Sequence, residues 1–135
     1  MTAVNIILIA AAAIALIAVV WMFNTLIGRK NNVAYAFASI DAMLKKRYGL
    51  IPNLVATVEK YMTYEGGVLE KLTGLRAKAV AGSLSEAETA ELDNQMTRAL
   101  RSLFAVAENY PALRASEPFV HLQASLNEVE EQLSA

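Results

Sequence analysis

The fold is decided by the stretch Val33–Ala79, which reads VAYAFASIDAMLKKRYGLIPNLVATVEKYMTYEGGVLEKLTGLRAKA. Counting from Val33 to Ala79 at alternating intervals of four and three residues gives fourteen positions, of which twelve are apolar or aromatic. They are Val33, Phe37, Ile40, Leu44, Arg47, Ile51, Leu54, Val58, Tyr61, Glu65, Val68, Leu72, Leu75 and Ala79. This spacing has the period of a helix seam that supercoils against partner helices. It predicts a coiled-coil-type face on one helix over about residues 32–81, or on two helices in line, roughly 70 Å long.

Three sites along this stretch weaken a helix. Pro52 removes a backbone hydrogen bond, but the apolar phase continues past it, so we predict a kink and not an end. Gly66-Gly67 costs about 1 kcal/mol per glycine relative to alanine, and here a bent or frayed continuous helix is favoured over a loop. Upstream, Gly28 and Asn31-Asn32 predict a break, with Asn32 as the N-cap of the long helix.

Two shorter helices are predicted after Gly82. Ser85 and Glu88 form a capping box that starts a helix over about 86–109, which Pro111 forces to end. Ser116 is the expected N-cap of a last helix over about 117–133. Both helices carry apolar stripes, at Leu92, Met96, Leu100, Leu103, Phe104, Ala107 and Tyr110 in the first, and at Phe119, Leu122, Leu126, Val129 and Leu133 in the second. The fold class is therefore all-α, an antiparallel long-helix bundle over residues 29–135.

Residues 1–28 predict a transmembrane anchor. They carry no charged side chain, and residues 6–27 are almost continuously apolar, long enough to cross the lipid core of a bilayer. A cleaved signal peptide is the alternative, but it needs a basic N-terminal region and a small-residue cleavage site. This segment instead ends in Trp21-Met22-Phe23. Arg29 and Lys30 follow it directly, so the positive-inside rule places the N-terminus outside and the bundle in the cytoplasm.

The charge distribution and the residue types exclude several function classes. Residues 29–80 carry nine basic and four acidic side chains, whereas residues 81–135 carry three basic and nine acidic ones, so the two halves have opposite net charge. There is no basic patch interleaved with aromatic residues, which argues against nucleic acid as a partner. The sequence lacks cysteine, a glycine-rich phosphate loop and zinc-ligand spacing. We therefore expect no enzyme activity, no cofactor and no small-molecule substrate.

The segment Leu44-Lys45-Lys46-Arg47-Tyr48-Gly49-Leu50-Ile51-Pro52-Asn53-Leu54-Val55 resembles the most recognisable motif of the LemA family. Glu108-Asn109-Tyr110-Pro111 is similar to the family's Glu-x-Tyr-Pro turn, and Phe119-Val120-His121-Leu122-Gln123 to its Phe-x-x-Leu-Gln segment. The resemblance implies a bacterial, membrane-anchored helical bundle with no established biochemical activity. Family members continue with a further helix, so this chain resembles a C-terminally short member. We expect a missing helix to leave an apolar groove, open to self-association or to another protein.

Arg47 and Glu65 are the two charged residues on the long seam. One interpretation is that both lie at the seam edges with their charges in solvent. The other is that Arg47 is partly buried and meets a carboxylate on a facing helix, where it sets register, with Glu108 as the candidate partner. On the second interpretation, Arg47→Leu keeps the helicity but changes the oligomeric state.

The remaining packing or partner candidates lie at the two prolines. Tyr48 and Asn53 flank Pro52, and the Asn53 amide or a water is expected to satisfy the carbonyl that Pro52 leaves free near Tyr48. Tyr110 and Pro111 form the second turn. His121 with Glu117 could present two metal ligands, but a metal site needs more donors, so a solvent-facing histidine is favoured.

Two functions from different classes fit these features. The first is a single-pass scaffold that is held in the bacterial inner membrane by residues 6–27 and presents its bundle to copies of itself or to another membrane protein. The second is a regulatory partner of a membrane enzyme or signalling complex, with the bends at Pro52 and Gly66-Gly67 as responsive elements. Self-association of the purified protein favours the first, and a stoichiometric unlike partner favours the second.

Overall fold

The computed structural model describes residues 2–134, which form helices joined by turns and contain no strand. The helices are α1 (Ala3–Glu59), α2 (Gly66–Val80), α3 (Glu86–Ala107), α4 (Pro111–Arg114) and α5 (Glu117–Ser134). The chain divides into two compact units, Met1–Ser39 and Ile40–Ala135. The all-α prediction is confirmed.

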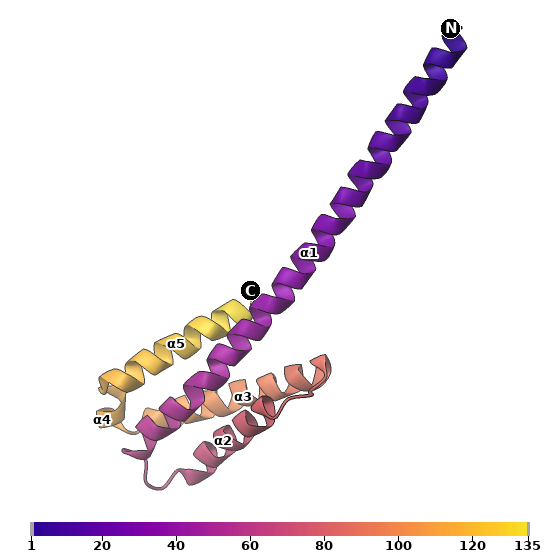
Figure 1. Ribbon diagram of the computed structural model, residues 1–135. Coiled ribbons are helices and arrows are strands. Elements are labelled where there is room, and N and C mark those ends of the chain that lie inside the picture. The colour runs from indigo at the N-terminus through magenta and orange to yellow at the C-terminus, as the bar shows by residue number, and fades with distance from the viewer. Residues whose placement is uncertain (1, 135) are drawn as a thin grey trace. The chain divides into compact units, whose positions relative to one another are not determined.

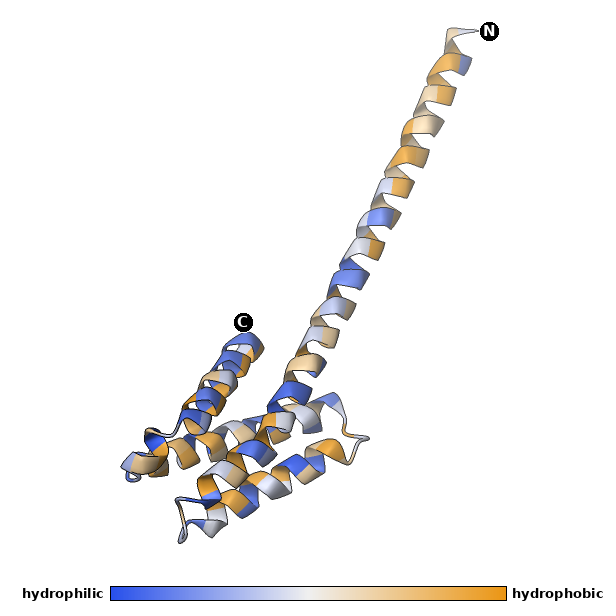
Figure 2. Ribbon diagram, turned by 60° about the vertical axis from the view of Figure 1, so that its left-hand side comes forward, coloured by the Kyte–Doolittle hydropathy of each residue, from blue (hydrophilic) through white to orange (hydrophobic). Residues whose placement is uncertain are grey.

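The first unit is the N-terminal part of α1. It contains a window that is long and apolar enough to cross a membrane, and none of that window is buried within the structure. Figure 2 shows the hydrophobic colour over much of this helix toward the end marked N. Such a helix is compatible with a membrane anchor, because an unburied apolar surface of this length is stable only in lipid or against a partner.

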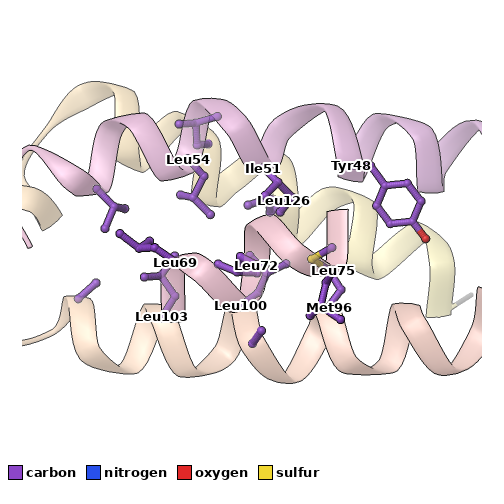
Figure 3. Close-up of a cluster of buried hydrophobic side chains, with 14 of the residues drawn as sticks. Tyr48, Ile51, Leu54, Leu69, Leu72, Leu75, Met96, Leu100, Leu103 and Leu126 are labelled. Carbon is purple, nitrogen blue, oxygen red and sulfur yellow. The ribbon is translucent and has the colours of Figure 1, made fainter. Parts of the chain in front are cut away.

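In the second unit, the C-terminal part of α1 packs with α2, α3 and α5, and the helices alternate in direction (Figure 1). The four helices share one core of leucine and other apolar side chains. Figure 3 shows how Ile51 and Leu54 of α1 face residues from the other helices, which are Leu69, Leu72 and Leu75 of α2, Met96, Leu100 and Leu103 of α3, and Leu126 of α5. The apolar stripes predicted for the two later helices lie in or against this core.

The long helix predicted over residues 32–81 is wrong in its middle. Helix α1 ends at Glu59 and α2 begins at Gly66, so a turn replaces the bent continuous helix. Backbone amides of Tyr61 and Met62 close the end of α1 on the carbonyl of Val58, both at 2.9 Å. Met62, which is off the predicted seam, is buried in place of Tyr61. The low helix propensity of the glycine pair decides this site, because both helices can still bury their apolar face in one core.

The break predicted at Gly28 and Asn31-Asn32 is also wrong, because α1 runs through these residues and Asn32 is not an N-cap. Helix-favouring residues on both sides outweigh the small propensity cost of one glycine and two asparagines. The first three seam positions, Val33, Phe37 and Ile40, are exposed instead of buried, and burial on the seam begins at Leu44. Pro52 lies inside α1 and does not end it, as predicted; the kink there stays a prediction.

The helix ends after residue 82 follow local chemistry. The capping box is confirmed, since the Ser85 hydroxyl accepts from the Glu88 amide and the Glu88 carboxylate accepts from the Ser85 amide at 2.8 Å. The Ser85 side chain and then its backbone amide hold the pKa of Glu88 below its usual value. The short helix α4 was not predicted, and Pro111 is its first residue. The Ser116 hydroxyl is buried and has no hydrogen-bond partner in the part of the chain that the structure describes, so it does not cap α5.

Candidate functional site

The candidate site is built around Arg47, the one charged side chain among the buried residues of the described chain. Arg47 lies on the core face of α1 between Leu44 and Ile51, and it is 2% exposed. A guanidinium keeps its charge when buried, so it requires carboxylates or other acceptors nearby. Its position on the seam therefore demands partners from the facing helices.

Those partners come from α3 and α5. One terminal nitrogen of Arg47 donates to Asp93 at 2.6 Å, and the other donates to Glu130 at 2.7 Å and to the Thr97 hydroxyl at 2.8 Å. The Thr97 hydroxyl in turn donates to Glu130 at 3.3 Å. We call these four residues the arginine cluster. It links three helices through charge-assisted hydrogen bonds, which are shorter and stronger than neutral ones.

The arginine cluster reaches the surface on its acidic side. Asp93 and Glu130 are 22% and 38% exposed, and Arg101 approaches Glu130 at 3.7 Å from the solvent side. A shallow cavity of about 380 Å³ opens there, lined by Asp93, Asn94, Thr97, Arg98, Arg101, Glu130, Leu133 and Ser134.

Near the arginine cluster, Lys46 pairs with Glu128 at 3.3 Å and adds a second contact between α1 and α5. Arg47 itself retains one buried nitrogen, Nε, without a hydrogen-bond partner in residues 2–134.

Tyr48 lies beside the arginine cluster and is also buried. Its hydroxyl has no hydrogen-bond partner among the described residues. Burial raises the pKa of the Tyr48 phenol, the Asp93 carboxylate adds to that shift, and the Arg47 guanidinium opposes it. Tyr48 is therefore a neutral packing residue at physiological pH.

The other predicted candidates do not join the arginine cluster. Glu108 is exposed and pairs with Arg114 at 3.1 Å, so it is not the partner of Arg47 that the sequence suggested. The reason is its place at the C-cap of α3, beyond the last buried turn of that helix. Glu65 is half-buried at the N-cap of α2 and its side chain makes no cap hydrogen bond.

At the prolines, Asn53 and Pro52 are exposed on α1, and no hydrogen bond joins the Asn53 amide to the Tyr48 carbonyl among the described residues. The Asn53 carbonyl instead accepts from the Thr57 hydroxyl at 2.8 Å. Tyr110 is half-buried at the N-cap of α4, and Pro111 is exposed. His121 and Glu117 are exposed on α5. Within residues 2–134, no group of three or more His, Cys, Asp or Glu side chains could hold a metal ion.

Sequence reasoning missed Asp93, Thr97 and Glu130. A signal was present, because Asp93 and Thr97 are four residues apart, one position after the stripe residues Leu92 and Met96. Glu130 follows the stripe residue Val129 in the same way. An acidic residue that flanks a stripe lies at the edge of the core, where the end of a long arginine from another helix can reach it.

Comparison with known proteins gives two similarities. A family model described as the LemA family matches residues 36–135. The curated Protein LemA of Metamycoplasma hominis is 24% identical over 112 residues, which cover 83% of this chain and 51% of that protein. The chain thus spans about half the length of that relative. The matched residues include all four members of the arginine cluster.

Proposed function

The chain belongs to the LemA family, and from this premise we propose that it is a single-pass, membrane-anchored helical interaction protein that acts as a scaffold. The observation that carries the proposal is α1. One helix includes the charge-free apolar segment of residues 3–28 and, from Leu44 onward, side chains buried in the bundle core. A helix built this way joins a lipid-soluble part to a water-soluble part.

We further propose that the membrane is the bacterial inner membrane, with the N-terminus outside and the bundle in the cytoplasm. Arg29 and Lys30 follow the apolar segment directly, and no charged side chain precedes it. Basic residues next to a membrane span favour the cytoplasmic side, so these two residues support this orientation.

The arginine cluster supports an interaction role over a catalytic one. Each terminal nitrogen of Arg47 is bonded to a carboxylate, and Glu130 accepts from Thr97 as well. Both carboxylates are therefore held in charge-assisted hydrogen bonds to a permanently charged arginine, which supports a structural role for them. What the cluster provides is a fixed register between α1, α3 and α5, so that the bundle presents a constant surface.

Two lysines in the middle of the anchor should release the protein from membranes. Each charged residue at the centre of a membrane helix costs about 2.5–3.5 kcal/mol, so Ile14→Lys combined with Ile17→Lys should shift the chain from the membrane pellet to the soluble fraction. The matched control is Asn31→Lys combined with Asn32→Lys, which adds the same charge beside Arg29 and Lys30 and should stay in the pellet. The measurement is the pelleted fraction after washing bacterial membranes with alkaline carbonate.

Release of the unaltered protein by the carbonate wash would contradict the anchor. The orientation is tested on the same cells. A protease added outside spheroplasts should leave the bundle intact, and digestion of the bundle there would reverse the proposed orientation.

A further inference from the structure

The part of α1 just after the anchor is an apolar surface without a partner. From Asn31 to Ser39 the helix carries no charged residue, and the three large apolar or aromatic side chains, Val33, Tyr35 and Phe37, are each between 55% and 76% exposed. We call residues 31–39 the juxtamembrane segment. In the proposed topology it follows Arg29 and Lys30 and therefore lies outside the lipid core, where exposed apolar side chains are unfavourable.

One face of this segment has the spacing of a helix seam. Val33 and Phe37 continue, in phase, the three-four spacing of the seam residues that are buried from Leu44 onward. The same phase extends backward through Leu16, Val19, Phe23, Leu26 and Lys30. Tyr35 follows Val33 by two residues, and Ser39 follows Phe37 by two residues. Because two residues correspond to about 200° around a helix, Tyr35 and Ser39 lie on the opposite side. The face that contains Val33 and Phe37 is therefore the one fitted to pack against another helix.

We propose that this face pairs with the same face of a second copy of the chain, in parallel and in register. The inference deepens the proposed function and rests on it, because a shared membrane fixes all copies in one direction at one depth. At equal depth, Val33 meets Val33 and Phe37 meets Phe37. No residue of the segment is charged, so identical surfaces approach without like-charge repulsion.

Between residues 16 and 44, Lys30 is the one charged residue in phase with this face. Its position next to the apolar segment allows the ammonium to reach lipid phosphates, while its methylene groups remain at the helix contact. An unlike partner would not need an uncharged segment, because it could match charge with opposite charge. The absence of charge over residues 31–39 therefore favours the symmetric pair.

The sequence offers a clean test because it contains no cysteine. Single-cysteine variants of the full chain, Val33→Cys and Phe37→Cys, are expressed in bacterial membranes and oxidised with copper-phenanthroline. We expect both to give disulfide-linked dimers on a non-reducing gel. The matched controls Tyr35→Cys and Ser39→Cys, on the opposite side of the same two turns, should give several-fold less dimer.

Each other outcome overturns the pairing. Equal cross-linking at all four positions means random collision, no cross-linking means that the face does not pair, and a cross-link to a protein of different mass means that an unlike partner covers it. In these cases the proposed function stands as long as the variants remain in the carbonate-washed membrane. Loss of the variants and of the unaltered protein from that membrane would instead overturn the proposed function itself.

Discussion

Replacing Arg47 with methionine should lower the free energy of unfolding of the bundle by about 3 kcal/mol. Methionine replaces the apolar stem of Arg47 with an unbranched apolar side chain of similar reach, so the core beside Leu44 and Ile51 stays filled, and only the guanidinium is lost. The guanidinium is the only positive charge within hydrogen-bond reach of Asp93 among the described residues. It is also the closer of the two arginine side chains that approach Glu130, the other being Arg101. Two carboxylates then face each other at the edge of the core, with the Thr97 hydroxyl as the remaining close donor.

The measurement is urea unfolding of the full chain in mild detergent, followed by far-ultraviolet circular dichroism. Residues 3–28 should give a constant helical background there, so the transition reports the bundle. Arg98→Met is the matched control, since Arg98 pairs with Glu91 at 3.3 Å with both side chains mostly exposed, and its loss should cost less than about 1 kcal/mol. Equal effects of the two substitutions would mean that the arginine cluster contributes no more than a surface ion pair.

A triple replacement separates two causes of the lost stability. One is the loss of the arginine, and the other is the presence of two carboxylates that no longer have it as a partner. Arg47→Met together with Asp93→Leu and Glu130→Leu should recover most of the lost stability, because a buried ion cluster can be replaced by apolar side chains at little cost. If the arginine cluster sets the register, this triple variant should also change the oligomeric state, as expected for Arg47→Leu. An unchanged assembly would remove the register role and leave only a stability role.

Leu54→Ala should cost about 3–5 kcal/mol of unfolding free energy. Leu54 is fully buried on α1 and faces core residues of the other helices (Figure 3). Truncation removes three carbons, and the surrounding leucines, fixed on several helices, cannot close the cavity without moving a backbone.

The control for Leu54→Ala is Val120→Ala on α5, where the side chain is half exposed and should contribute less than about 0.5 kcal/mol. Both variants are compared with the unaltered chain by the urea midpoint at a constant slope. A loss below about 1 kcal/mol for Leu54→Ala would mean that α1 does not form part of the bundle core.

Much of the bundle followed from the sequence because its helices are amphipathic. The stripes at Leu92–Ala107 and Phe119–Val129 predicted two helices and their buried faces, and the Ser85–Glu88 capping box predicted where α3 begins. Periodicity did not reveal the turn before Gly66, because antiparallel neighbours that share a core keep the same apolar spacing. Only the weak helix propensity of Gly66-Gly67 distinguished one long helix from two.

The arginine cluster followed from the sequence in part. Of the two interpretations of Arg47 on an apolar seam, the structure agrees with the buried arginine that meets a carboxylate, and it provides two carboxylates. The sequence did not identify them, because the rotation of α3 and α5 about their axes decides which acidic residue faces α1. Glu108 was misassigned because Arg47 meets α3 at Asp93 and Thr97, whereas Glu108 lies at the C-cap of that helix, several turns further along.

We expect the proposed membrane-anchored bundle to assemble with copies of itself. The most direct test is the protein mass of the full chain in mild detergent, measured by light scattering on a sizing column with the detergent contribution subtracted. We expect one uniform species at twice the 14.6 kDa of a single chain. A folded monomer of the full chain at 14.6 kDa would contradict self-assembly and direct the search to an unlike membrane partner.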